Sequence, residues 1–182
     1  MFKTCLVLFT LLINCLIAVE SPGLKRLMDG NKRYTSDLLE HPNRTPERRE
    51  SIACKQEPFA IIIGCSDSRV SPEIIFDQGI GDLFVVRVAG NVVGPLELDS
   101  IDYAALYLHS SVLLVLGHER CGAVNAVIQG ATQDIQAISA LIQPAVKEEK
   151  KKNPPHLLEA CIKTNALNMK NYLLTTLSLI HI

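Results

Sequence analysis

Three side chains of the types that bind zinc occur in two separate segments of the sequence. His118 and Cys121 are three residues apart, and Cys65 lies far upstream of them. Catalytic zinc sites favour cysteine sulfur and histidine nitrogen, usually with three protein ligands and a fourth position left open. A His-x-x-Cys spacing alone is also typical of a helix start with a buried thiol. The prediction of a metal site therefore depends on the fold bringing Cys65 to the same point.

The elements that must position these residues can be predicted from the apolar pattern. Three continuous apolar runs rich in β-branched residues indicate strands that are covered on both faces. Helical patterns separate the runs, and this alternation predicts an α/β fold with a central, mainly parallel β-sheet, right-handed crossovers and flanking helices. The predicted strands cover residues 59–64, 83–89 and 112–117, and the predicted helices begin near Ser71, cover about 96–109 and begin again at Cys121.

The predicted topology places the candidate ligands at one edge of the sheet. Cys65 follows the first strand directly, and His118 follows the third. In open α/β sheets, ligands bind beyond the carboxyl ends of the strands. We therefore expect Cys65, His118 and Cys121 to meet at that edge.

Two further helices are predicted before the first strand. Residues 23–40 carry apolar side chains at the spacing of an amphipathic helix. Thr45 offers an N-cap and Pro46 suits the first helical position, so a short second helix should begin there and end before Pro58.

Length and charge limit the classes of function. The 182 residues suit one domain with a single hydrophobic core. Lys and Arg total 18 against 19 Asp and Glu, which gives a formal net charge of -1. No stretch gathers enough basic residues to follow a phosphate backbone, so we expect no nucleic-acid partner. The run of charges at residues 147–152 mixes signs at helical spacing and is interpreted as a solvated helix face.

The first twenty residues have the layout of a secretory signal. Lys3 precedes an apolar run over residues 5–19, and Glu20 begins a polar boundary. We therefore predict a signal peptide over residues 1–20, a single domain over residues 21–182, and a secreted or periplasmic protein. The alternative is an uncleaved N-terminal anchor. The apolar run is short for a membrane span, which needs about 20 apolar residues. We expect no stable span once the signal is removed.

The cysteines divide into three groups. Of the six, Cys5 and Cys15 lie in the predicted signal, and two are the candidate metal ligands. Cys54 and Cys161 lie in amphipathic segments that are predicted to be helical, where buried thiols are the expected state.

Two motifs around the candidate ligands carry a resemblance to a known family. Residues 27–34 and 76–91 are also similar to that family, so the resemblance covers about residues 23–150. It implies a β-carbonic anhydrase-like fold and one Zn2+ per chain, bound by the residues that match the family ligands, which are Cys65, His118 and Cys121. The two motifs that resemble the β-carbonic anhydrase signatures are Cys65-Ser66-Asp67-Ser68-Arg69 and His118-Glu119-Arg120-Cys121-Gly122-Ala123.

The resemblance also implies an enzyme, a carbonic anhydrase that hydrates carbon dioxide. Zinc-bound hydroxide would attack CO2 and give bicarbonate and a proton, reversibly. The aspartate that matches Asp67 either fills the fourth zinc position or leaves it to water, whose hydrogen bond it would then accept. Arg69 would hold the Asp67 carboxylate through two hydrogen bonds and draw it off the metal.

Four residues match the substrate pocket of the family. Gln56 and the backbone amide of Gly122 would donate hydrogen bonds to substrate oxygen, and Phe84 and Tyr103 would form an aromatic wall. In the family this wall is shared across a dimer interface, which implies a homodimer or a higher homo-oligomer. From the residues alone, Phe84 suits the core of a strand and Tyr103 suits ordinary helix packing equally well.

The sequence departs from the family pattern in two places. The chain has no tryptophan, and Ile62 stands where some bacterial members carry one that helps to form an inhibitory bicarbonate site. This favours the form without that site, with zinc open to water. After a helical stretch over about 157–167, family members usually supply another strand and a terminal helix, whereas this chain has an atypical tail at about 168–182. We therefore expect the final strand and helix to be missing.

Two other functions are compatible with these residues. A related zinc hydrolase that acts on carbonyl sulfide or carbon disulfide would keep the same ligands and change mainly the pocket. The altered tail favours instead a non-catalytic zinc-binding fragment. Asp67 and Arg69 favour catalysis, because a purely structural zinc site needs no such pair.

Overall fold

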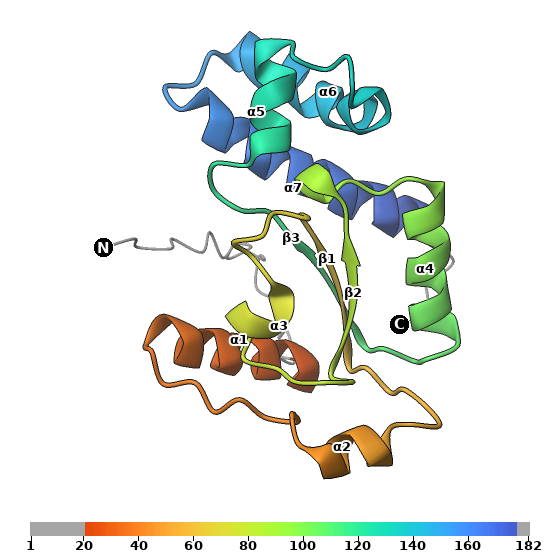
Figure 1. Cartoon of the computed structure of the whole chain (residues 1–182). Helices are drawn as coiled ribbons and strands as arrows, with labels where there is room; N and C mark the ends of the chain where they lie inside the picture. The colour runs from red at the N-terminus through yellow and green to blue at the C-terminus, as the bar shows by residue number, and fades with distance from the viewer. Residues whose placement is uncertain (1–20, 178–182) are drawn as a thin grey trace.

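The computed structural model describes residues 21–177, and a parallel β-sheet lies at their centre (Figure 1). Both strand pairings are parallel, with Ile62 opposite Val85 on one side and Leu114 on the other. The predicted α/β fold is confirmed, and each predicted strand agrees with an observed one to within two residues at either end. The strands are β1 (Ala60–Gly64), β2 (Leu83–Arg87) and β3 (Val112–Leu116), in the order β2-β1-β3.

Helices surround this sheet. Figure 1 shows α1 and α3 on one side of the strands and α4 on the other, while α5 and α6 pack together beyond the carboxyl end of the sheet and α7 runs from them to the strands. The helices are α1 (Pro22–Thr35), α2 (Pro46–Ser51), α3 (Pro72–Ile75), α4 (Pro95–Leu106), α5 (Gly122–Gln129), α6 (Gln136–Lys152) and α7 (Leu157–Thr176), with a 3-10 helix η1 (Ala89–Asn91) between β2 and α4.

Side chains along β1 alternate between two apolar layers, as the period of two in a strand requires. Ala60 and Ile62 pack in the layer that contains α1 and α3. Ile61 and Ile63 pack in the opposite layer, with residues of α4, α5, α6 and α7. Burying each of these isoleucines contributes about 1.5–3 kcal/mol. Because β1 is buried along its whole length, its end is a rigid place from which to present a ligand.

The first helix is shorter than the sequence predicted. The apolar spacing indicated a helix over 23–40, but α1 ends at Thr35. Asp37 adopts a left-handed backbone with φ 58°, which ends the helix. The backbone N–H groups of Glu40 and His41 then donate to the buried carboxylate of Asp77, each at 3.0 Å. A contact far away in the sequence therefore overrides the local pattern.

The second helix starts as predicted. The hydroxyl of Thr45 accepts a hydrogen bond from the backbone N–H of Arg48 at 3.2 Å, and Pro46 occupies the first helical position. The helix ends at Ser51, well before the first strand. Cys54 follows it in a bend and is exposed, so the prediction of a buried helical thiol is wrong there, whereas Cys161 of α7 is buried as expected.

The helix that ends the described residues is longer than predicted. α7 continues without a break to Thr176, and Met169 and Leu173 pack into the core. Residues 168–176, expected to belong to an atypical tail, thus form the last turns of a core helix. Residues 178–182 of that tail and the predicted signal peptide over residues 1–20 lie outside the described residues. Within residues 21–177 the sheet has three strands.

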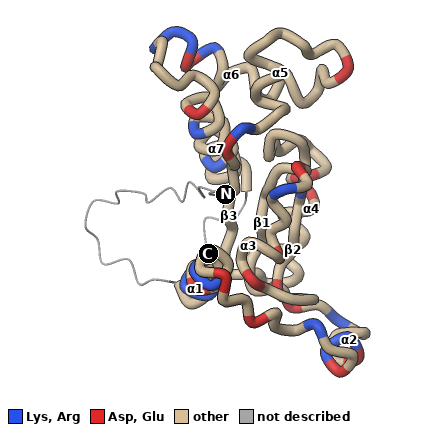
Figure 2. The backbone as a smooth tube through the Cα atoms, turned by 60° about the vertical axis from the view of Figure 1, so that its left-hand side comes forward, with Lys and Arg blue, Asp and Glu red and all other residues tan. Residues whose placement is uncertain are grey.

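Charged residues lie mainly on the helices, with both signs interspersed (Figure 2). The run at residues 147–152 lies on α6, and most of it faces solvent as predicted. Glu149 is an exception, because it is buried and accepts hydrogen bonds from Lys152 at 2.8 Å and Thr164 at 2.6 Å. Among the described helices, none is long and apolar enough to cross a membrane.

Candidate metal centre

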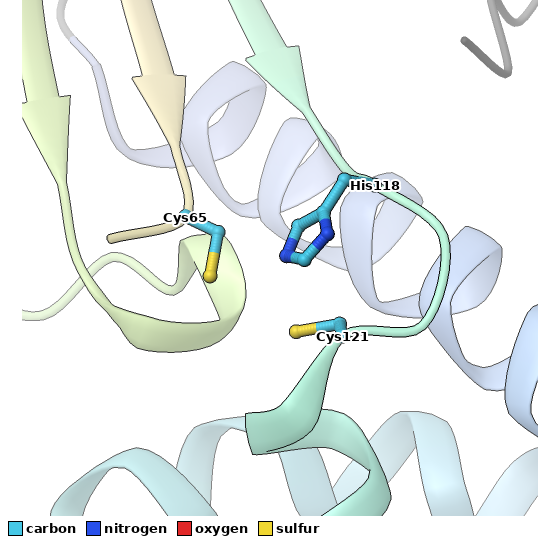
Figure 3. Close-up of side chains that lie close together, drawn as sticks. All are labelled: Cys65, His118 and Cys121. Atoms are coloured by element: carbon cyan, nitrogen blue, oxygen red, sulfur yellow. The ribbon is translucent and has the colours of Figure 1, made fainter. Parts of the chain in front are cut away.

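Three elements bring Cys65, His118 and Cys121 to the carboxyl end of the sheet. Cys65 follows β1 directly, His118 lies just beyond β3, and Cys121 is the N-cap residue of α5. Their ligand atoms all lie within 4.8 Å of one another, and the side chains point toward one another (Figure 3). All three residues are buried. The structure therefore places together the residues expected to be ligands, in a group that could hold a metal ion.

The imidazole of His118 is oriented by the backbone. Its Nδ1 lies 2.9 Å from the carbonyl oxygen of Glu119, which can only accept, so Nδ1 carries the proton and Nε2 presents a lone pair. Nε2 is buried and has no hydrogen-bond partner within residues 21–177. A buried polar atom without a partner is unfavourable, and a cation at the three-residue group would satisfy it.

The two thiols form a hydrogen-bonded pair with opposite pKa shifts. The hydrogen bond from Cys121 holds the pKa of the Cys65 thiol below its ordinary value despite burial, and the Gly90 N–H at 3.2 Å from the sulfur acts in the same direction. The same pairing and burial raise the pKa of Cys121. Cys65 is therefore the thiolate, and Cys121 keeps a proton that a bound dication would displace. Two cysteine sulfurs and one histidine nitrogen are a ligand set that zinc prefers.

Asp67 and Arg69 form the expected two-point ion pair beside this group. Arg69 donates from Nε to Oδ1 of Asp67 at 2.9 Å and from Nη2 to Oδ2 at 2.8 Å. Its backbone N–H also donates to Oδ1 at 3.0 Å. These bonds hold the pKa of Asp67 well below its usual range, so the carboxylate is ionised. Oδ2 lies 3.9 Å from Nε2 of His118, and Asp67 is thus beside the three-residue group while both its oxygens are engaged by Arg69.

Comparison with protein families identifies the chain. A sequence model of the family described as carbonic anhydrase matches residues 60–181, which is more than half of the chain. The chain belongs to this family. Carbonic anhydrase 2 of Mycobacterium tuberculosis is 49% identical over 104 residues, which make up 57% of this chain and 50% of that protein. The chain therefore spans about half the length of these curated relatives, which include the carbonic anhydrase of Mycolicibacterium smegmatis.

Solved structures place the fold in the β class of carbonic anhydrases. The β-carbonic anhydrase CcaA matches with a TM-score of 0.66 and 25% sequence identity, over 87% of this chain and 76% of that one. The β-carbonic anhydrase CafA of the fungal pathogen Aspergillus fumigatus matches with a TM-score of 0.62 and 26% identity, over 80% of this chain and 71% of that one.

Arg87 is a residue of this site that the sequence analysis missed. It is the last residue of β2 and pairs with Gly64 in the sheet. Its guanidinium donates from Nε to the carbonyl oxygen of Cys65 at 2.9 Å and from Nη2 to that of Asp67 at 2.6 Å. It therefore holds the loop that carries a ligand and the ion pair. The signal in the sequence was a single charge within the apolar run 83–89.

Of the four expected pocket residues, only Gly122 lies beside the metal centre. It directly follows Cys121 at the start of α5, and a Cβ built on it would meet no atom of the described residues within 4 Å. The side-chain position of Gly122 is therefore open.

The other three pocket residues lie toward the amino end of the sheet. Phe84 is near the start of β2, and its ring is 6.4 Å from that of Tyr103 on α4, measured between ring centroids. Gln56 precedes β1, and it lines with Tyr103 an open depression of about 660 Å³. None of the residues around this depression is Cys65, His118 or Cys121. The structure does not bring Gln56, Phe84 and Tyr103 to the metal centre within one chain.

Proposed function

We propose that this chain binds one Zn2+ through Cys65, His118 and Cys121 and catalyses the reversible hydration of carbon dioxide to bicarbonate and a proton. The observation that carries the proposal is the convergence of two thiols and an imidazole whose buried Nε2 has no partner in residues 21–177. Membership of the carbonic anhydrase family supports it. When bound, zinc would supply Lewis acidity, which makes water a nucleophile near neutral pH.

Asp67 would orient the water that attacks CO2. Its carboxylate is ionised and can only accept hydrogen bonds, so it would accept one from the water and aim a lone pair of the water oxygen at the substrate. Arg69 keeps the carboxylate beside the centre, because it engages both oxygens of Asp67. The amide of Gly122, which directly follows the ligand Cys121 at the start of α5, would donate to an oxygen of the substrate.

We propose that the substrate pocket is completed by a second copy of the chain. Tyr103 of α4 stacks with Tyr107, the C-cap residue of this helix, and the two residues are 46% and 72% exposed. Exposed aromatic residues of this kind are enriched at protein interfaces. A homodimer that buries them would present Gln56, Phe84 and Tyr103 to the metal centre of the partner, which one chain does not do by itself.

Two measurements on the purified full chain test the proposed activity. We expect metal analysis to find one zinc ion per chain, and stopped-flow mixing with CO2 to show acceleration over buffer. Zinc without acceleration, together with sulfide release from carbonyl sulfide or carbon disulfide, would replace the proposal by the related hydrolase. Zinc with neither reaction would identify a non-catalytic zinc-binding fragment.

We propose further that residues 1–20 direct export of the protein. The support is the apolar run behind Lys3 in the sequence. We expect the intact mass of the protein in the exported fraction to be that of a chain without the signal. The full-length mass in a membrane fraction would indicate the uncleaved anchor.

A further inference from the structure

The turn between β2 and α4 contacts the sulfur of Cys65. The Gly90 N–H donates to Cys65 Sγ at 3.2 Å, and this bond is buried. Gly90 has φ 77° and ψ 16°, and the carbonyl of Val88 accepts from the N–H of Asn91 at 2.8 Å. This is the conformation of the third residue of a type II turn, which needs positive φ and therefore favours glycine. The orientation of the turn decides whether its N–H meets the sulfur.

Asn165 of α7 holds this turn from the opposite side. The residue is fully buried, and its Nδ2 donates to the carbonyl oxygen of Gly90 at 2.8 Å. One turn further along α7, the sulfur of Met169 lies 3.3 Å from the N–H of Val93. The helix therefore holds the segment after β2 at two points, of which Asn165 is the one that contacts Gly90 itself.

Removing the Asn165 amide would leave the Gly90 carbonyl buried without this donor. A buried carbonyl without a hydrogen bond destabilises the folded state by about 1–3 kcal/mol. The turn would therefore shift to a position in which the carbonyl accepts from another donor. Ile142 packs against one face of Gly90, because a Cβ built there would lie 2.7 Å from its Cδ1, and this bars a shift in that direction. The N–H and the carbonyl of Gly90 belong to one tight turn, so a shift of the carbonyl would also displace the N–H from the sulfur of Cys65.

We propose that Asn165 is a positioning residue of the metal centre, which keeps the Gly90 N–H hydrogen bond on the Cys65 sulfur and thereby strengthens metal binding. The inference rests on the proposed zinc site. It means that α7, far along the chain from Cys65, influences the affinity of that site for metal. An N–H bond to a metal-bound thiolate stabilises the charge on sulfur, so its loss changes both the affinity and the electronic spectrum of the bound metal.

Zinc and cobalt binding to the full chain test this role. We expect Asn165→Leu, which keeps a similar volume and lacks the donor, to weaken Zn2+ affinity about tenfold in competition with a chelator. With Co2+ as the probe, the sulfur-to-cobalt charge-transfer band should move to lower energy, because the sulfur loses a hydrogen bond. Asn171→Leu, the same substitution at an exposed position of α7, should leave both measurements unchanged.

A second control separates positioning from general support of the core. Leu173 is buried in α7 and belongs to the main apolar cluster, so Leu173→Ala should lower the melting temperature without changing the cobalt spectrum. The proposal is overturned if folded Asn165→Leu binds zinc like the unaltered chain, or if Leu173→Ala shifts affinity and spectrum equally. If Asn165→Leu does not fold, Asn165→Ala removes the same donor and is judged by the same two measurements.

The outcome is separable from that of the proposed activity. A chain that binds zinc but does not hydrate CO2 contradicts the proposed reaction, while the effect of Asn165→Leu on binding still decides the positioning role. A chain that binds neither zinc nor cobalt overturns the metal site and this inference together.

Discussion

The two ends of the β-sheet differ in how much of a site one chain supplies. At the carboxyl end, Cys65, His118 and Cys121 converge, and backbone groups of the same chain orient them. At the amino end, Gln56 and Tyr103 line an open depression of about 660 Å³, and aromatic rings are left exposed. The metal ligands meet through contacts within the chain, whereas the substrate pocket, under the proposed function, is completed by a second copy. Each end should therefore respond to substitution separately.

Loss of a metal ligand should have the largest effect on zinc affinity. This effect should be confined to the carboxyl end of the sheet. Cys121→Ser removes a thiolate from the proposed site, and zinc affinity should fall by more than about 100-fold, which exceeds the loss typical of a residue outside the ligand set. Metal analysis and CO2 hydration check this. Cys54→Ser is the matched control for metal analysis, because Cys54 is exposed and lies outside the metal centre, and it should leave zinc affinity unaltered.

Substitution of Asp67 should separate catalysis from metal binding. Asp67→Asn keeps the shape but removes the charge that Arg69 holds, so the attacking water loses its anionic acceptor and can meet an N–H donor instead. We expect turnover to fall by about 100-fold, within the range for a positioned acid or base, while zinc content stays the same. Unchanged turnover in stopped-flow assays would contradict the orienting role of Asp67.

Loss of the Arg87 clamp should have a smaller effect on both properties. Arg87→Met removes the donors to the carbonyls of Cys65 and Asp67 and retains the apolar stem. Turnover and zinc affinity should each fall by about tenfold, since residues that orient ligands typically contribute 10- to 100-fold. Arg49→Met, at an exposed position of α2, is the control and should change neither quantity.

At the amino end, substitution should weaken association without affecting zinc. Tyr103→Ala removes an aromatic ring from the proposed interface, and the dimer should dissociate about 30-fold more readily, as for an interface residue worth about 2 kcal/mol. Sedimentation and zinc analysis check the two halves of this prediction. Tyr172→Ala, at another exposed tyrosine, should leave association intact. Loss of zinc from Tyr103→Ala would contradict the independence of the two ends.

The smallest effect is expected at Thr45, which lines neither the metal centre nor the depression at the amino end. Thr45→Ala removes the N-cap of α2, which should reduce the free energy of unfolding by about 1 kcal/mol. Zinc affinity and turnover should be unaltered. Denaturant unfolding measures the first quantity. A change in turnover would show that the start of α2 supports the depression, which Ile52 at the other end of the helix lines.

The local sequence pattern predicted an element correctly where one local feature, such as an apolar run or an N-cap, dominates the stability of that element. The unbroken apolar run 59–64 predicted the buried strand β1, and Thr45 with Pro46 predicted the start of α2. The pattern failed at residues 36–40, because the carboxylate of Asp77 binds the backbone there instead of letting the helix continue. It also failed for Cys54, which lies in an exposed bend after α2.

By itself, the sequence determined the α/β fold and the meeting of Cys65 with His118, because parallel strands present their carboxyl ends at one edge. It did not determine which groups orient those ligands. Arg87 and Asn165 reach the site through hydrogen bonds to backbone carbonyls distant in the sequence, and such bonds leave no periodic pattern to read. Only the tertiary structure decided these contacts. Every residue has a backbone carbonyl, and the packing of the chain determines which donor lies beside it.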